Sequence, residues 1–110
     1  MRVSSFIAAF TLLMAVPISA AQARNLSRQE VQVCRWGSEV AASAQHAKLS
    51  GKTLYSTRRV LLKRNYSQPW MRKMAVGITE QTFSSHSRAA PAAVGKSYYW
   101  GCVAHEKNRH

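Results

Sequence analysis

Two cysteines, Cys34 and Cys102, constrain the fold of this chain more than any other feature of its sequence. They are its only thiols, and they stand near opposite ends of the sequence that follows residue 23. A bond between them would close most of that sequence into one loop and bring its first and last elements together. Whether they pair depends on the compartment, because disulfides persist in oxidising environments and are rare in the cytosol.

The N-terminus predicts export. Arg2 precedes an apolar run over residues 6–16, and small residues follow that run. This order is typical of a secretory signal peptide, predicted over residues 1–23, with cleavage after Ala23 or, as the alternative, after Ala20. The run is too short for a stable transmembrane anchor, so we expect no transmembrane segment after cleavage and a periplasmic or secreted protein. A retained amphipathic anchor is the alternative.

Export makes a disulfide the expected state of the two thiols. In an oxidising compartment two cysteines with no other candidates pair, so we predict a Cys34–Cys102 bridge. The chain-entropy model assigns about 4 kcal/mol to a loop of that size, which is comparable to the net stability of a small domain. Two buried free cysteines or an intermolecular bridge are the alternatives. Residues 24–110 are too few for two cores, so they form a single domain.

The helix that carries Cys34 has well-specified ends. Ser27 and Glu30 have the spacing of a capping box, in which each side chain accepts a bond from the backbone N–H of the other residue. Small residues recur at helical spacing between Gly37 and Ala47, which allows a neighbouring helix to approach closely. Gly51 suits the left-handed position just after the end of a helix.

Two more helices are predicted in the middle of the chain. One spans residues 53–64, with Val60 lying off its apolar stripe. After a break, the next begins at Pro69, a residue that the first turn of a helix tolerates. Its periodicity places Trp70 on the apolar face and Thr79 on the outward face.

The last helix is predicted to begin at Pro91 and to carry Cys102. The fold class is therefore all-α, a small antiparallel bundle of about four helices clamped by one disulfide. An α+β fold with a short strand over residues 96–100 is the alternative, because three aromatic residues follow one another there.

The layout resembles a group of small exported proteins. It is similar to that of the two-cysteine helical proteins exported by Gram-negative bacteria. The shared features are an export signal, a cysteine early in an Ala-rich first helix, a Gly stop, a Pro-started last helix and the closing Tyr99-Trp100-Gly101-Cys102. Most members of that group have no assigned function. The resemblance implies an exported helical domain with one bridge, and it implies no catalytic or binding residue.

The charge is strongly basic and unevenly spread. Sixteen Lys and Arg stand against four acidic residues, and fifteen of those bases remain once Arg2 leaves with the signal. No acidic residue occurs between Glu39 and Glu80, a span in which aromatic side chains lie among several bases. Arginines beside aromatic rings suit phosphate groups. The candidate anion-binding residues are Arg58, Arg59, Lys63, Arg64, Arg72, Lys73, Tyr66 and Trp70.

The partners expected of an exported basic protein are anionic envelope polymers, namely lipopolysaccharide, anionic lipid or acidic glycan. Nucleic acid is not expected to be a partner in the cell. The alternative is that the bases form a solvated surface that only maintains solubility. We predict a non-enzymatic binding or interaction protein. Two other roles stay open: a protein-interaction role as inhibitor, immunity factor or chaperone, and a cationic secreted effector.

The sequence has few candidate catalytic residues. The chain has no Asp, and its four Glu are scattered rather than paired as in a glycosidase. His46, His86 and His105 are interpreted as surface and loop residues rather than a base and acid set. His105 and His110 are not spaced for a structural zinc site and belong to a tail expected to be frayed. We therefore predict no enzyme activity, no metal and no cofactor.

Overall fold

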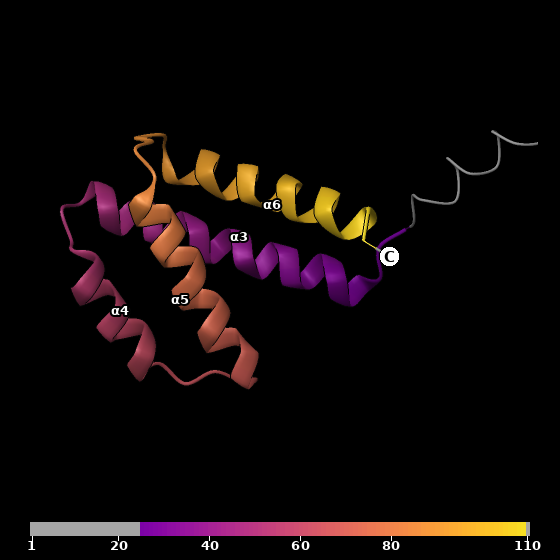
Figure 1. The fold of residues 1–110 in the computed structure, drawn as a ribbon, viewed down its shortest axis with the longest axis horizontal. Helices are drawn as coiled ribbons and strands as arrows, with labels where there is room; N and C mark the ends of the chain where they lie inside the picture. Colours follow the sequence, from indigo (N-terminus) through magenta and orange to yellow (C-terminus); the bar gives the residue numbers. More distant parts are fainter. Residues whose placement is uncertain (1–24, 110) are drawn as a thin grey trace, which may run out of the picture.

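The computed structural model describes residues 25–109, which form four helices (Figure 1). They are α3 (Arg28–Leu49), α4 (Leu54–Lys63), α5 (Pro69–Ser84) and α6 (Pro91–Lys107). The predicted all-α bundle is confirmed. The strand considered for residues 96–100 is wrong, because these residues lie inside α6. The predicted signal peptide and its cleavage sites lie outside the described residues.

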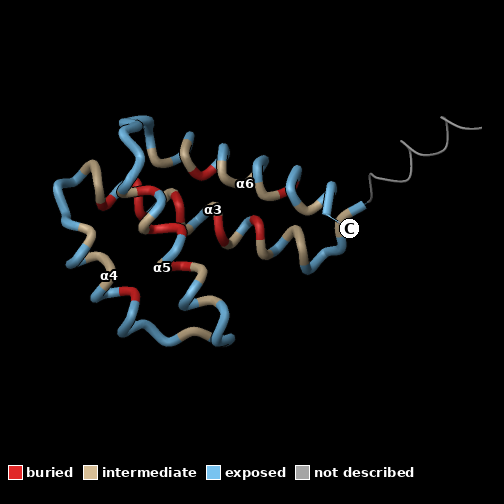
Figure 2. The backbone as a smooth tube through the Cα atoms, in the orientation of Figure 1, coloured by how far each residue is buried: buried red, intermediate tan, exposed pale blue. Residues whose placement is uncertain are grey.

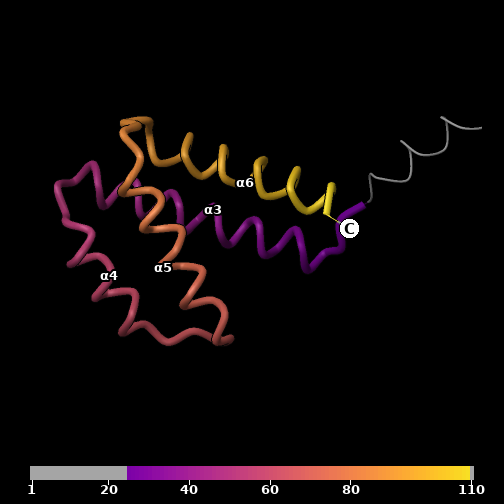
Figure 3. Tube along the Cα trace, viewed as in Figure 1, coloured from indigo at the N-terminus to yellow at the C-terminus, as the bar shows by residue number. Residues whose placement is uncertain are grey.

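The long helix α3 is the centre of the bundle, since it contacts all three other helices. Within residues 25–109, α6 runs antiparallel along α3 and packs on that helix alone, while α5 crosses another side of α3 (Figures 1 and 3). Helix α4 returns antiparallel to α5, packs mainly on it and makes few contacts with α3. The α4–α5 hairpin and α6 are therefore held together through α3.

Both ends of α3 are closed as the sequence predicts. The Ser27 backbone N–H donates to Glu30 Oε1 at 2.9 Å, and the Glu30 N–H donates to Ser27 Oγ at 3.1 Å, which completes the capping box. At the other end Gly51 has φ +87°, and its N–H donates to the Lys48 carbonyl at 3.1 Å. The Lys52 N–H reaches the Ala47 carbonyl at 3.0 Å, so the helix ends in a Schellman motif.

The core contains many small side chains, and half of its buried apolar residues lie on α3 (Figure 2). Its buried apolar residues are Cys34, Ala41, Ala44, Ala47, Leu61, Ala75, Ile78 and Val103. One buried polar side chain, Gln45, holds the loop between α5 and α6: its Nε2 donates to the carbonyls of Ser87 at 3.1 Å and Ala89 at 2.8 Å. A buried amide satisfied in this way fixes the position of the loop on α3.

Two side chains of α5 lie differently from the prediction. Thr79 is buried at 1% exposure, and Trp70 is 44% exposed. Helix α5 packs on both α3 and α4. Its buried surface therefore includes residues outside the apolar stripe that the periodicity of α5 alone predicts. Trp70 stands in the first turn, at the edge of the core.

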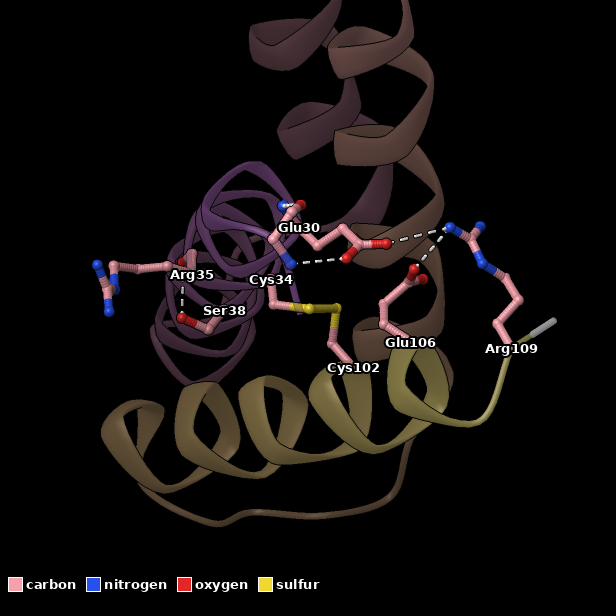
Figure 4. Close-up of a disulfide and its surroundings, with 8 residues drawn as sticks. Glu30, Cys34, Arg35, Ser38, Cys102, Glu106 and Arg109 are labelled. Atoms are coloured by element: carbon pink, nitrogen blue, oxygen red, sulfur yellow. Dashed lines mark hydrogen bonds and ion pairs between the residues drawn. A yellow bond between two sulfur atoms is a disulfide. The ribbon is translucent and has the colours of Figure 1, made fainter. Parts of the chain in front are cut away.

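The Cys34–Cys102 disulfide is confirmed and joins α3 to α6, with the two Cα atoms 5.6 Å apart (Figure 4). Close to the bridge, Arg109 Nη2 lies 2.9 Å from Glu106 Oε1 and 3.5 Å from Glu30 Oε2. The residues from His105 to Lys107, predicted to belong to a frayed tail, form the last turn of α6. The C-terminal end of the described chain is thus tied to the start of α3.

Candidate functional site

Helix α4 carries three basic side chains, Arg58, Arg59 and Lys63. The Thr53 side chain caps it by accepting the Ser56 N–H at 3.0 Å, and the ten helical residues include no acid. Arg59 and Lys63 stand four residues apart and are both exposed. Tyr55 at 70% exposure and Leu62 at 51% lie beside them. At helical spacing these four side chains fall within about 100° of one another, and we call them the outer face of α4.

Arg59 is positioned by an aromatic neighbour. Its guanidinium carbon lies 5.7 Å from the centroid of the Tyr55 ring, one helical turn before it. A guanidinium held over a ring keeps its N–H donors directed outward and loses less freedom when it meets a phosphate. Tyr55 thus serves the site by orienting a base, a role that the sequence prediction did not assign to it.

Arg58, by contrast, turns toward α5. Its Nε lies 3.4 Å from Glu80 Oε2, in an ion pair whose geometry is not that of an aligned hydrogen bond. Because both side chains are substantially exposed, the pair adds little to stability. It does neutralise one of the predicted anion-binding bases.

Arg72 and Tyr66 build the connection between α4 and α5. The Arg72 guanidinium lies 5.3 Å from the Tyr66 ring centroid, and its Nη2 donates to the Arg64 carbonyl at 3.1 Å. The Tyr66 hydroxyl donates to the Leu61 carbonyl at 3.0 Å. Both side chains therefore add donors at the C-terminal end of α4, where the Leu61 carbonyl also accepts the Arg64 backbone N–H at 3.2 Å.

Trp70 also has a packing role. Its ring meets Trp36 of α3 edge to face, with centroids 5.9 Å apart and planes at 84°. This geometry is favourable for an aromatic pair and joins the start of α5 to the middle of α3. Part of Trp70 remains exposed, but its position is set by the bundle.

The eight predicted anion-binding residues do not form one cluster. Arg59 and Lys63 share the outer face of α4, Arg64 lies on another side of that helix, and Lys73 stands exposed on α5. In residues 25–109 none of these four side chains pairs with a carboxylate. The structure thus separates available bases from those that maintain the fold.

A groove that the sequence prediction missed lies between α3 and α4. Its volume is about 490 Å³, and Trp36, Val40, Ala44, Val60 and Leu61 supply its main apolar lining. Val60 is 60% exposed, although it is an aliphatic residue. A single aliphatic side chain off an apolar stripe is common on protein surfaces, so Val60 gave no signal of a groove in the sequence.

Within residues 25–109, no group of three His, Cys, Asp or Glu side chains is placed to hold a metal ion. His46, His86 and His105 are exposed, as predicted. Burial raises the pKa of the Tyr98 phenol, which lies between α3 and α6 and away from the basic surface. None of the described helices is both long enough and apolar enough to cross a membrane.

Comparison of the chain with known protein families, curated proteins and solved structures finds no match.

Proposed function

We propose that this is a non-enzymatic binding protein of the periplasm or cell exterior that contacts anionic envelope polymers: lipopolysaccharide, anionic lipid or acidic glycan. The observation that carries the proposal is the outer face of α4, where Arg59 and Lys63 are exposed beside Tyr55 and Leu62. The Cys34–Cys102 bridge is typical of proteins from oxidising compartments and supports the assignment to the envelope.

The mixture of side chains on this face favours anionic lipid surfaces and phosphorylated polymers over a simple solvated patch. Surface-binding helices place apolar side chains at the level of the headgroups and bases against the phosphates. Arg59 offers a planar fork that can bind a phosphate through two donors, and Lys63 adds a point charge one turn away. Tyr55 and Leu62 contribute apolar area that a charge interaction alone would not need.

The test is retention of the oxidised mature protein on lipopolysaccharide vesicles and on heparin as salt is raised. The variant Arg59→Ser/Lys63→Ser removes both bases of the outer face and leaves the structural residues Arg58, Arg72 and Tyr66 in place. Because a base near an anionic surface contributes about 1 kcal/mol, we expect roughly tenfold or greater loss of affinity at low salt.

The matched control is Arg35→Ser/Lys96→Ser, which removes the same charge from exposed positions on α3 and α6. It should lose much less affinity than the α4 variant. Equal losses in the two variants would mean that retention reports net charge and not a site. Retention that does not weaken with salt would also contradict the proposal, because a phosphate contact of exposed bases is screened.

A further inference from the structure

The groove between α3 and α4 has the features of a second binding site. It arises because α4 leans on α5 and leaves α3 after the connecting turn, so that apolar side chains of both helices line an open space. A volume of about 490 Å³ falls within the usual range for small-molecule sites. The floor is formed by buried Ala44, Ala47 and Leu61, and Val60 forms part of the wall.

The charges along the groove are asymmetric. Lys52 lies at the end near the α3–α4 turn, close to the start of α4, where the positive end of the helix dipole adds to its charge. The lining residues of the other end include both Arg64 and Glu39, whose charges oppose each other. Lys52 forms no ion pair with the described residues. An anionic group is therefore attracted more strongly to the Lys52 end of the groove than to the Arg64 end.

We propose that this groove binds a single-chain anionic amphiphile, with its acyl chain along Val40, Val60 and Leu61 and its headgroup at Lys52. The apolar side chains of the groove shield part of the acyl chain from water, and the Lys52 ammonium meets a carboxylate or phosphate. Trp36, which packs on Trp70, closes the far end of the apolar wall. This inference uses side chains other than the outer face of α4 and does not depend on the proposed function.

The experiment is calorimetric titration of the oxidised protein with dodecanoate, below the concentration at which it forms micelles. Decanoate and dodecyltrimethylammonium serve as the shorter-chain and the cationic probe. We expect one saturable site for dodecanoate, weaker binding of decanoate by up to about fourfold per methylene removed, and much weaker binding of the cation. Equal binding of the anionic and the cationic probe would overturn the proposal.

One blocking variant and its control test whether the acyl chain lies in the groove. Ser43 is exposed and lines the groove, so Ser43→Trp fills the space without disturbing the core. It should abolish dodecanoate binding, whereas Gln32→Trp, on an exposed position of the same helix outside the groove, should leave it unchanged. Thermal unfolding of both variants verifies that they are folded. Binding that persists in Ser43→Trp, or several ligands bound without saturation, contradicts a groove site.

For the headgroup, Lys52→Gln should weaken dodecanoate binding about tenfold, and Arg64→Gln should weaken it clearly less. A larger loss in Arg64→Gln would place the anion at the opposite end and refute the proposed orientation. Arg59→Ser/Lys63→Ser should retain full dodecanoate affinity. A failure of vesicle binding and a failure of groove binding are thereby distinguished, because each is measured with a variant that leaves the other site intact.

Discussion

The ring of Tyr98 in α6 lies directly against Gly37 in α3, so closely that a Cβ atom added to Gly37 would come within 2.5 Å of Tyr98 Cε1. The same interface has a second close approach, where a Cβ on Gly95 would lie 3.0 Å from the Ser38 carbonyl oxygen. Helices α3 and α6 can approach to this distance because each lacks a side chain at the point of contact. Since α6 packs on α3 alone among the described helices, these two glycines determine how the last helix is held.

Gly37→Ala is expected to destabilise the protein by about 1–2 kcal/mol, because overpacking the interface costs more than the better helix propensity of Ala returns. The matched control is Gly77→Ala: Gly77 is exposed in α5, and an added Cβ there meets nothing within 4 Å. That substitution should stabilise the protein by up to about 1 kcal/mol. Urea unfolding measures the change in the free energy of unfolding for each variant. A stabilised Gly37→Ala would contradict the packing described.

Tyr98 is also expected to make the free energy of unfolding depend on pH in the alkaline range. Burial raises the pKa of its phenol, so the folded state favours the neutral form more strongly than the unfolded state does. The resulting stability is complete below the unfolded pKa, about 10, and is lost as pH rises through the higher folded pKa. Wild type should therefore lose stability above about pH 10 more steeply than Tyr98→Phe. Urea unfolding from pH 8 to pH 11 tests this, and parallel pH profiles would refute it.

Lys48 is expected to be the base that contributes most to folding. Its Nζ donates to the carbonyls of Thr82 at 3.0 Å, Ser85 at 2.9 Å and Ser87 at 2.9 Å, so it closes the C-terminal end of α5 and the loop that follows. Replacing it with Met leaves these acceptors without that donor and should cost about 2 kcal/mol. Lys52→Met, on an exposed side chain, should change stability by less than about 0.5 kcal/mol. Thermal unfolding compares the two, and equal effects would show that the three bonds are weak.

The ends of the helices and the bridge could be predicted from the sequence because they depend on short-range chemistry. The Ser27–Glu30 box and the Gly51 stop each need residues only a few positions apart. The disulfide followed from two thiols and an export signal. Tertiary packing decided the rest. The buried position of Thr79 depends on α5 being covered from two sides.

The candidate site was only partly predictable for the same reason. Arg58, Arg59 and Arg72 look alike in a basic stretch, yet one pairs with Glu80, one lies over an exposed ring and one donates to a backbone carbonyl. Backbone acceptors and partners from another helix leave no local pattern in a sequence. The groove has no signature either, because it exists only where α4 departs from α3.

Removing the disulfide is expected to release α6 first. The bridge fixes Cys102 to Cys34, and α6 has no other described helix to pack on. Cys34→Ala/Cys102→Ala should lower the free energy of unfolding by up to about 4 kcal/mol in the chain-entropy model. In native-state hydrogen exchange the amides of α6 should lose protection more than those of α5, because α5 keeps its contacts with α3 and α4.

The control for this experiment is Arg109→Gln, which removes an exposed ion-pairing side chain at the same end of the bundle. It should change stability by less than about 1 kcal/mol and leave protection in α6 nearly intact. A uniform loss of protection across all helices of the double cysteine variant would contradict the expected order. It would mean that α6 and the α4–α5 hairpin unfold together through α3, and that the bridge stabilises one cooperative unit.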